Sequence, residues 1–152
     1  MEFPGNHKDA HLGLKQPELA AVNRLLIKND LPDSDLTEES MAHFLCYGNA
    51  ASPDGVIGLE LYGDDALLRS LVVNENSRKT GCGTILVNAI ESLACELGVR
   101  NLYLLTTTAE DYFARKGYRL IDRAEVSDGI RASSEFSSLC PSSAAVMRKP
   151  LS

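Results

Sequence analysis

The residues with the clearest chemical meaning are the seven of 78–84, which read R-K-T-G-C-G-T. An apolar run, Ala66 to Val73, precedes them, and an amphipathic pattern that begins near Gly83 follows. This order predicts a strand, a glycine-bearing turn and a helix N-terminus, where backbone N–H groups and the helix dipole attract an anion. Gly81 and Gly83 allow the main chain to approach a ligand closely. The segment therefore predicts a phosphate-binding site.

A second candidate is an arginine inside the apolar run. Arg69 alternates with Leu67 and Leu71, and a charge in such a place needs a partner. A tight turn around Asp64 and Asp65 predicts a hairpin in which the numbers of facing residues sum to 129, so that Glu60 faces Arg69. One interpretation is a cross-strand salt bridge alone. The other turns the pair into a substrate groove, where Arg69 grips an anionic group and Glu60 acts as the base through a water.

The rest of the pattern supplies the elements that must position these residues. Helices are expected at 17–29, 84–97 and 109–116, with a helical turn at 36–39. Strands are expected near 10–14 and at 42–47, 56–62, 67–73, 101–105, 118–126 and 144–148, with a serine-rich loop at 127–143. This order predicts an α/β fold, a twisted mixed sheet with helices on both faces and a ligand site where neighbouring strands diverge.

Length and composition narrow the function. The 152 residues predict one domain, 1–152, with 1–15 partly a flexible tail. Net charge is −6 and the pI is near 5.0, which argues against a nucleic-acid partner or an anionic membrane surface. The sequence has no apolar run of the roughly 20 residues that a membrane span needs. The polar N-terminus does not resemble a signal peptide, so the expected location is cytoplasmic.

The cysteines predict neither a disulfide framework nor a metal site. They are scattered along the chain at Cys46, Cys82, Cys95 and Cys140. Their spacing contains no C-x-x-C pair, so a structural zinc site is not expected. Cys46 and Cys95 are expected to pack in the core, and small size explains Cys82 in its turn.

The spacing R-x-x-G-x-G resembles the pyrophosphate signature of the GNAT superfamily of acetyl-CoA-dependent N-acetyltransferases. The similarity runs from about Gln16 to the end, and the predicted order of elements is that of the GNAT fold. A second segment, Ala109 to Tyr118, resembles the family's helix-glycine-aromatic pattern beside the cofactor thiol. The other interpretation is that Gly81 and Gly83 only form a tight connection between a strand and a helix.

The resemblance implies a role for particular residues. It implies cofactor contacts at Leu71, Val72, Val73, Arg78, Lys79, Thr80, Gly81, Cys82, Gly83, Thr84, Thr106 and Phe113. A backbone N–H near the bulged end of the strand 67–73 would stabilise the oxyanion. Phe113 stands where the family often has the tyrosine that protonates the thiolate. Tyr112 is a substitute acid, with Tyr103 and Thr106 as further alternatives, although packing or capping explains each of them too. The catalytic candidates are therefore Glu60, Arg69 and Tyr112.

A narrower resemblance concerns three segments, 68–73, 104–109 and 134–144. They are similar to the GNAT subfamily encoded in arsenic-resistance operons, which implies an acetyltransferase linked to arsenic detoxification. Thiolates favour trivalent arsenic, which draws attention to Cys140 and Cys46. Their spacing does not show that they meet.

Three functions follow from these patterns. The main prediction is transfer of an acetyl group from acetyl-CoA to a small amine that bears an anionic group. The second is a non-catalytic acetyl-CoA-binding sensor or partner module, which Phe113 favours. The third is acetylation of a protein N-terminus or lysine, against which the acidic surface argues. By analogy with the family, a homodimer is expected.

Overall fold

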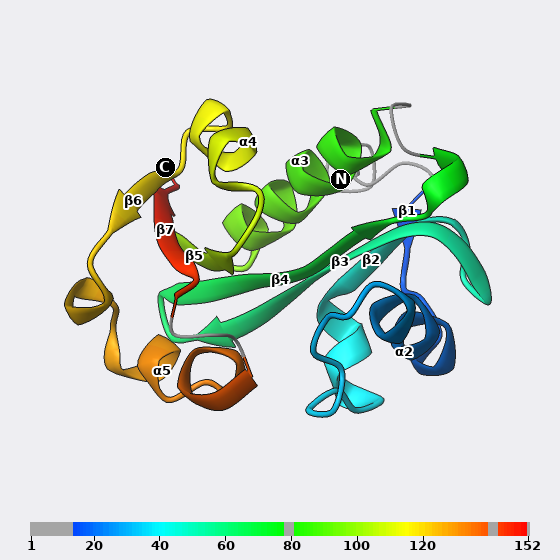
Figure 1. Ribbon diagram of the computed structural model, residues 1–152, viewed down its shortest axis with the longest axis horizontal. Coiled ribbons are helices and arrows are strands. Elements are labelled where there is room, and N and C mark those ends of the chain that lie inside the picture. The colour runs from blue at the N-terminus through cyan, green and yellow to red at the C-terminus, as the bar shows by residue number, and fades with distance from the viewer. Residues whose placement is uncertain (1–13, 78–80, 140–142, 152) are drawn as a thin grey trace.

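In the described residues, seven strands form one mixed sheet in the order β1-β2-β3-β4-β5-β7-β6 (Figure 1). The structure is a computed structural model that describes residues 14–77, 81–139 and 143–151. The strands are β1 (Leu14–Lys15), β2 (Phe44–Asn49), β3 (Ser52–Tyr62), β4 (Asp65–Val73), β5 (Asn101–Thr106), β6 (Arg119–Ile121) and β7 (Ala145–Pro150). β4 and β5 are parallel, and the other neighbours are antiparallel. The predicted α/β fold with a mixed sheet is confirmed.

Helices cover both faces of the sheet (Figure 1). The α-helices are α2 (Leu19–Lys28), α3 (Cys82–Glu96), α4 (Glu110–Arg115) and α5 (Asp128–Arg131). Other helical turns are η1 (Glu39–His43), η2 (Glu75–Ser77), η3 (Arg123–Glu125) and η4 (Glu135–Leu139). α3 and α4 lie on one face, whereas α2, α5 and η4 lie on the other. Within the described part of the chain, no helix is long and apolar enough to span a membrane.

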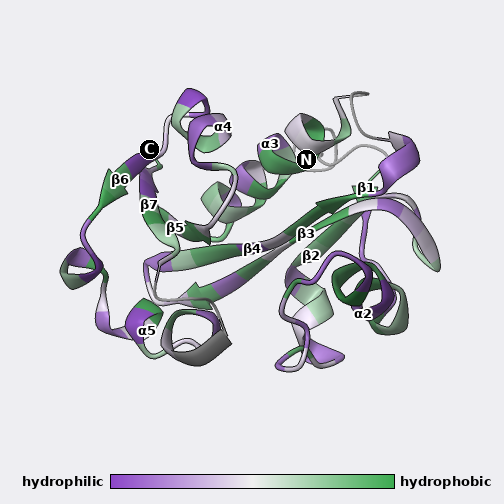
Figure 2. Ribbon diagram, in the orientation of Figure 1, coloured by the Kyte–Doolittle hydropathy of each residue, from purple (hydrophilic) through white to green (hydrophobic). Residues whose placement is uncertain are grey.

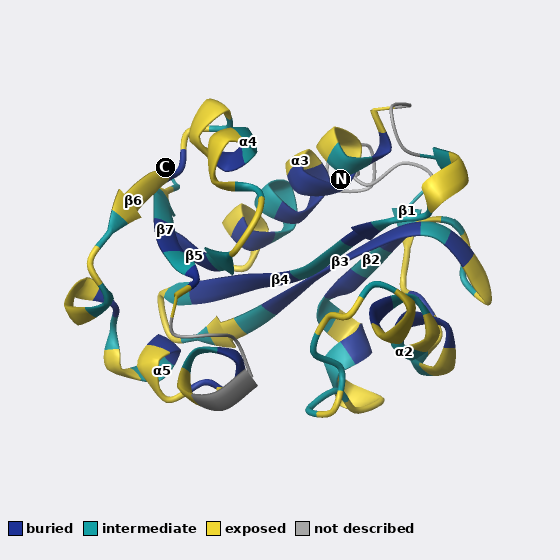
Figure 3. Ribbon diagram, in the orientation of Figure 1, coloured by how far each residue is buried: buried dark blue, intermediate teal, exposed yellow. Residues whose placement is uncertain are grey.

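Alternating strand residues fill the two layers. On the α3 face, Leu86 and Ile90 belong to the same buried cluster as Ile57 of β3. On the α2 face, Leu26 packs in a cluster with Val56 of β3. The strands and the inner sides of the helices are accordingly apolar and buried, and the outer sides are polar (Figures 2 and 3). This two-sided burial fixes the register of the central strands.

Four predicted elements differ from the structure. The helical turn expected at 36–39 is η1 at Glu39–His43. The segment 48–55 lies between the expected strands 42–47 and 56–62. Because β3 begins at Ser52, most of this segment is strand, and only the tip of the hairpin is a turn. β6 ends at Ile121 and not at Val126. The expected loop of 127–143 contains α5 and the single π-helical turn η4. Helices of four or five residues are too short to produce a recognisable hydrophobic period, so the sequence pattern could not reveal them.

The predicted register of the β3–β4 hairpin was wrong. Its facing residues sum to 127 near the turn, so Tyr62 pairs with Asp65 and Arg69 lies opposite Gly58. The turn is formed by Gly63, whose φ of 66° suits glycine, and by Asp64. Glu60 is therefore the diagonal neighbour of Arg69, a separation that long side chains still bridge.

A β-bulge interrupts β4 after Arg69. Gly58 pairs with Arg69 and Val56 with Val72, so Ser70 and Leu71 lie opposite the single residue Ile57. Ser70 has a φ of 62°, which is uncommon for a residue other than glycine. The extra residue reverses which face each later side chain occupies.

The predicted alternation of β4 was therefore wrong beyond the bulge. Leu67 packs in the cluster that contains Ile130 of α5, and Val72 packs in the α2 cluster. Leu71 and Val73 instead pack against the α3 cluster. Arg69 thus lies before the bulge, and Leu71, which lies after it, is on the opposite face of the sheet.

Candidate active site

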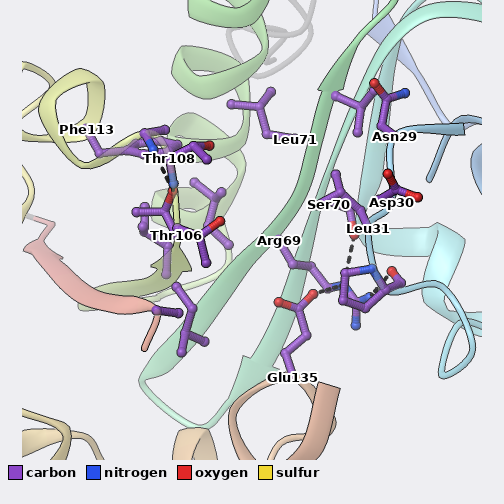
Figure 4. Close-up of a pocket in the computed structure, with 18 of the residues that line it drawn as sticks. Asn29, Asp30, Leu31, Arg69, Ser70, Leu71, Thr106, Thr108, Phe113 and Glu135 are labelled. Atoms are coloured by element: carbon purple, nitrogen blue, oxygen red, sulfur yellow. Dashed lines mark hydrogen bonds and ion pairs between the residues drawn. The ribbon is translucent and has the colours of Figure 1, made fainter. Parts of the chain in front are cut away.

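The site begins where two parallel strands separate. β4 and β5 pair only at residues 65–67 with 101–103. Beyond these pairs they enclose a cavity of about 850 Å³ (Figure 4). Residues 68–73 line one wall and residues 104–109 the other. This confirms the expected divergence, and the volume lies within the range of small-molecule sites.

At the bulge, peptide groups of β4 border this cavity. Ser70 and Leu71 both line it, and they have no ladder partner on β3 of their own. In the described ladder, β5 no longer pairs with β4 after Leu67. The facing edge of β4 therefore presents peptide groups that an extended, amide-containing ligand can pair with.

The end of β4, whose last residue Val73 lines the cavity, lies beside the N-terminus of α3. Gly81 is the N-cap with a φ of 83°, and it has no side chain to accept a hydrogen bond from the first turn. A Cβ built on Gly83 would lie 3.7 Å from Cγ2 of Val73, which lines the cavity. The predicted ligands Arg78, Lys79 and Thr80 fall outside the described residues.

Arg69 is the centre of a buried polar group at the floor of the cavity (Figure 4). It is 2% exposed, and three carboxylates surround it, from Asp35, Glu60 and Glu135. Its two terminal nitrogens bind both oxygens of Asp35, and Nη1 is also 2.6 Å from Oε2 of Glu60. We call these four residues the Arg69 cluster.

Every N–H group of Arg69 has a partner. Nε lies 2.9 Å from Oε2 of Glu135 and donates to Oγ of Ser70, while Nη2 also donates to the carbonyl of Pro32. Burial alone would lower the pKa of Arg69, but the carboxylates outweigh it and raise the pKa above its ordinary value. The salt bridge to Glu60 is thus present. The alternative, an anion gripped by Arg69, has no donor left in this arrangement.

Glu60 is not placed as a base facing the substrate. Its Oε2 accepts from Arg69 and its Oε1 accepts from the hydroxyl of Tyr62 at 2.6 Å. Burial, together with Glu60, raises the pKa of Tyr62, so Tyr62 remains the donor. Of the three carboxylates that contact Arg69 in the described residues, the one that lines the cavity is Glu135, which the sequence interpretation missed. Sixty-six positions separate it from Arg69, and the serine-rich segment around it gave no periodic signal.

Two neighbouring aromatic residues of α4, Tyr112 and Phe113, have different surroundings. Phe113 is 5% exposed and lines the cavity, and its contact with a cofactor stays a prediction. The hydroxyl of Tyr112 lies 3.1 Å from Oγ1 of Thr84 at the start of α3. Tyr112 therefore joins α4 to α3. Thr106 lines the cavity and accepts hydrogen bonds from the backbone of residues 108 and 109, which is the capping role considered above.

The cysteines lie apart from this chemistry. Cys46 and Cys82 are buried, and burial raises the pKa of both thiols. Cys95 is exposed on α3 and does not pack in the core as predicted. Cys140 falls outside the described residues.

Comparison with known proteins identifies the family. The acetyltransferase (GNAT) domain matches residues 16–134. An amino-acid acetyltransferase of Pasteurella multocida is 32% identical over 81 residues, which are 49% of this chain and 18% of that protein. The chain thus spans less than a fifth of that curated relative.

Solved structures share the fold at low sequence identity. N-acetylglutamate synthase from Neisseria gonorrhoeae, complexed with coenzyme A and N-acetyl-glutamate, has a TM-score of 0.75 at 18% identity over 91% of this chain and 35% of that one. Rv2747 from Mycobacterium tuberculosis, in complex with CoA and NLQ, has a TM-score of 0.75 at 17% identity over 91% of this chain and 99% of that one. Since the domain match covers most of its length and these structures share its fold, the chain belongs to the GNAT acetyltransferase family.

Proposed function

We propose that this protein is an N-acetyltransferase that moves the acetyl group of acetyl-CoA to a small amine. The observation that carries the proposal is the cavity between the separated strands β4 and β5, one lining residue of which, Val73, lies beside the N-terminus of α3. One part of this site suits a peptide-like arm and the other suits a pyrophosphate. Two GNAT structures of the same fold contain coenzyme A.

The chain offers a distinct group for each part of acetyl-CoA. Main-chain groups of residues 71–73 would pair with the pantetheine arm, and the first turn of α3 would hold the pyrophosphate. Arg78 and Lys79 would add positive charge there. Phe113 provides an apolar wall. The thioester supplies an activated acetyl group when acetyl-CoA is bound.

The remaining tasks are performed by the protein around the acetyl group. A peptide N–H at the bulge near Leu71 would stabilise negative charge on the carbonyl oxygen. The amine must arrive beside the bulge and lose a proton before attack. A thiol has a reference pKa of about 8.5, so the departing thiolate needs no dedicated acid, which fits the position of Phe113.

The experiment is product detection. Purified protein is incubated with acetyl-CoA and a panel of amines: amino acids, arsenic- or phosphorus-containing analogues, diamines and lysine peptides. We expect a mass increase of one acetyl group on at least one small amine, with CoA released in equal amount. Acetyl-CoA binding with no product from any amine would favour the second candidate, a sensor or partner module, which Phe113 supports. Product on peptides alone would instead favour a protein acetyltransferase.

Finer features of the function are supported by the sequence alone. The link to arsenic resistance rests on the similarity of the segments 68–73, 104–109 and 134–144. The arsenic-containing members of the panel test it directly. A cytoplasmic location and a homodimer are further proposals, and light scattering at several protein concentrations tests the second.

A further inference from the structure

Glu135 stands out among the buried charges. Of the three carboxylates that contact Arg69 in the described part of the chain, only Glu135 lines the cavity. It is 6% exposed and extends from η4 toward Arg69 (Figure 4). Its backbone segment lies on the same face of the sheet as α5. A buried carboxylate at a cavity wall is therefore supplied by an element outside β4 and β5.

Arg69 does not neutralise this carboxylate fully. One guanidinium charge is shared among Asp35, Glu60 and Glu135, so the Arg69 cluster carries one positive and three negative charges. Such a cluster attracts a cation in the adjoining cavity, and low local polarity strengthens that attraction. An amine at neutral pH is such a cation.

The other carboxylates nearby are less suitable. Asp35 and Glu60 also bind Arg69, but neither is among the residues that line the cavity. Asp30 lines the cavity, but it is exposed at the end of α2. Only Glu135 combines burial with a place on the cavity wall.

We infer that Glu135 receives the acceptor amine as an ammonium group and takes its proton. This inference rests on the proposed function. The ammonium gives one proton to the carboxylate of Glu135, and the freed lone pair forms a C–N bond with the acetyl carbonyl carbon. The C–S bond breaks, and its electron pair leaves on sulfur. The second proton of the nitrogen goes to the thiolate or to water, and Glu135 returns its own proton to water.

Arg69 is then a positioning residue for Glu135. Its Nε holds one carboxylate oxygen at 2.9 Å, and the same guanidinium binds the segment that contains Asp35. The arrangement fixes the direction of the Glu135 side chain without occupying the cavity. Removal of the Glu135 charge should therefore affect the amine and leave the CoA site intact.

The first test measures amine binding without turnover. Protein saturated with CoA is titrated by calorimetry with putrescine, ethanolamine and L-glutamate. We expect at least one of these probes to bind the native protein, and Glu135→Gln to weaken that binding at least about tenfold. Glu60→Gln is the matched control, because it removes a charge from the same arginine but none from the cavity wall. Equal binding by Glu135→Gln, or no binding of any probe to the native protein, would overturn the inference.

The second test is the pH dependence of kcat/KM with an accepted amine. The native rate should fall toward acidic pH as the base becomes protonated, and Glu135→Gln should lose this acidic limb together with most of its rate. Glu135→Asp should keep the limb at a reduced rate, and so should Glu60→Gln. A limb retained by Glu135→Gln and lost by Glu60→Gln would assign the base to Glu60 instead. The melting temperature and the acetyl-CoA affinity of Glu135→Gln should equal those of the native protein. If they do, a negative result counts against the role of Glu135 and not against the proposed function.

Discussion

Replacement of Arg69 by methionine should lower the free energy of unfolding by about 3–5 kcal/mol. The substitution leaves the carboxylates of Asp35, Glu60 and Glu135 buried together, with side chains only 7–23% exposed. Each loses its cationic partner, and they repel one another. Because these contacts join three separate segments to β4, their loss should also loosen the wall of the cavity. Urea denaturation with linear extrapolation measures the change.

The pH dependence of this variant provides a further check. Since the pKa of Arg69 is raised by its carboxylates, which outweigh the effect of burial, its contribution to native stability is present below the ordinary arginine pKa and is lost only as the pH rises through the raised value. In the variant, the destabilisation requires ionised carboxylates, so it should shrink at mildly acidic pH. Arg131→Met is the control, because Arg131 is half-exposed, its partner Asp128 is fully exposed, and solvent screens their ion pair across 3.7 Å, so the loss should be much smaller. Equal losses in both variants would contradict the buried cluster.

Gly58→Ala should destabilise the protein by about 3 kcal/mol. Gly58 lies opposite Arg69 beside the bulge, and a Cβ there would overlap the ring of Phe44, with Cε2 only 2.6 Å away. Phe44, the first residue of β2, is 1% exposed and packs in a buried cluster with residues of α2, so its ring has little room to move. The strain should be transmitted to the paired residue Arg69. Thermal and urea unfolding measure the loss.

A double-mutant cycle isolates the cause. Phe44→Leu alone should destabilise by removing ring atoms from the core, but Gly58→Ala should cost less in that background. Gly83→Ala is the space control, because its Cβ would meet only Cγ2 of Val73 at an ordinary 3.7 Å. Additive losses at positions 44 and 58 would show that the overlap is not what makes glycine necessary.

The elements with strong hydrophobic periods were predictable. α3 was expected at 84–97 and spans Cys82–Glu96, and Gly98 ends it with a φ of 83°. β5 was expected at 101–105 and extends one residue further. In each case many apolar residues share one face, and their spacing can be recognised within one continuous segment of the sequence.

The floor of the site was not predictable in the same way. One extra residue at the bulge moves Leu71 and Val73 to the face opposite Arg69. The bulge includes Ser70 with a φ of 62°, and a serine at this position does not predict that conformation. Glu135 and Asp35 reach Arg69 from positions 66 later and 34 earlier in the chain. Contacts between such distant positions depend on how three segments pack, which a local pattern does not contain.

The wall of the cavity shows the opposite case. Residues 71–73, Thr106 and Phe113 were selected through the family resemblance, and all of them line the cavity. Their selection depended on the order of elements, because a strand, a crossover helix and a parallel strand bring these positions to one edge. Their contacts with a cofactor remain a prediction.

The most direct measurement is calorimetric titration of the native protein with acetyl-CoA, alongside Gly83→Asp and Gly83→Asn. A Cβ at this position meets only ordinary contact with Val73, and an aspartate in the first turn of a helix favours the helix itself. If the cavity and the N-terminus of α3 hold acetyl-CoA, the native protein binds at one site per chain. Gly83→Asp then weakens binding at least about tenfold, by repulsion of the pyrophosphate, and Gly83→Asn retains most of it. No binding by the folded native protein, or equal binding by all three, would contradict this account.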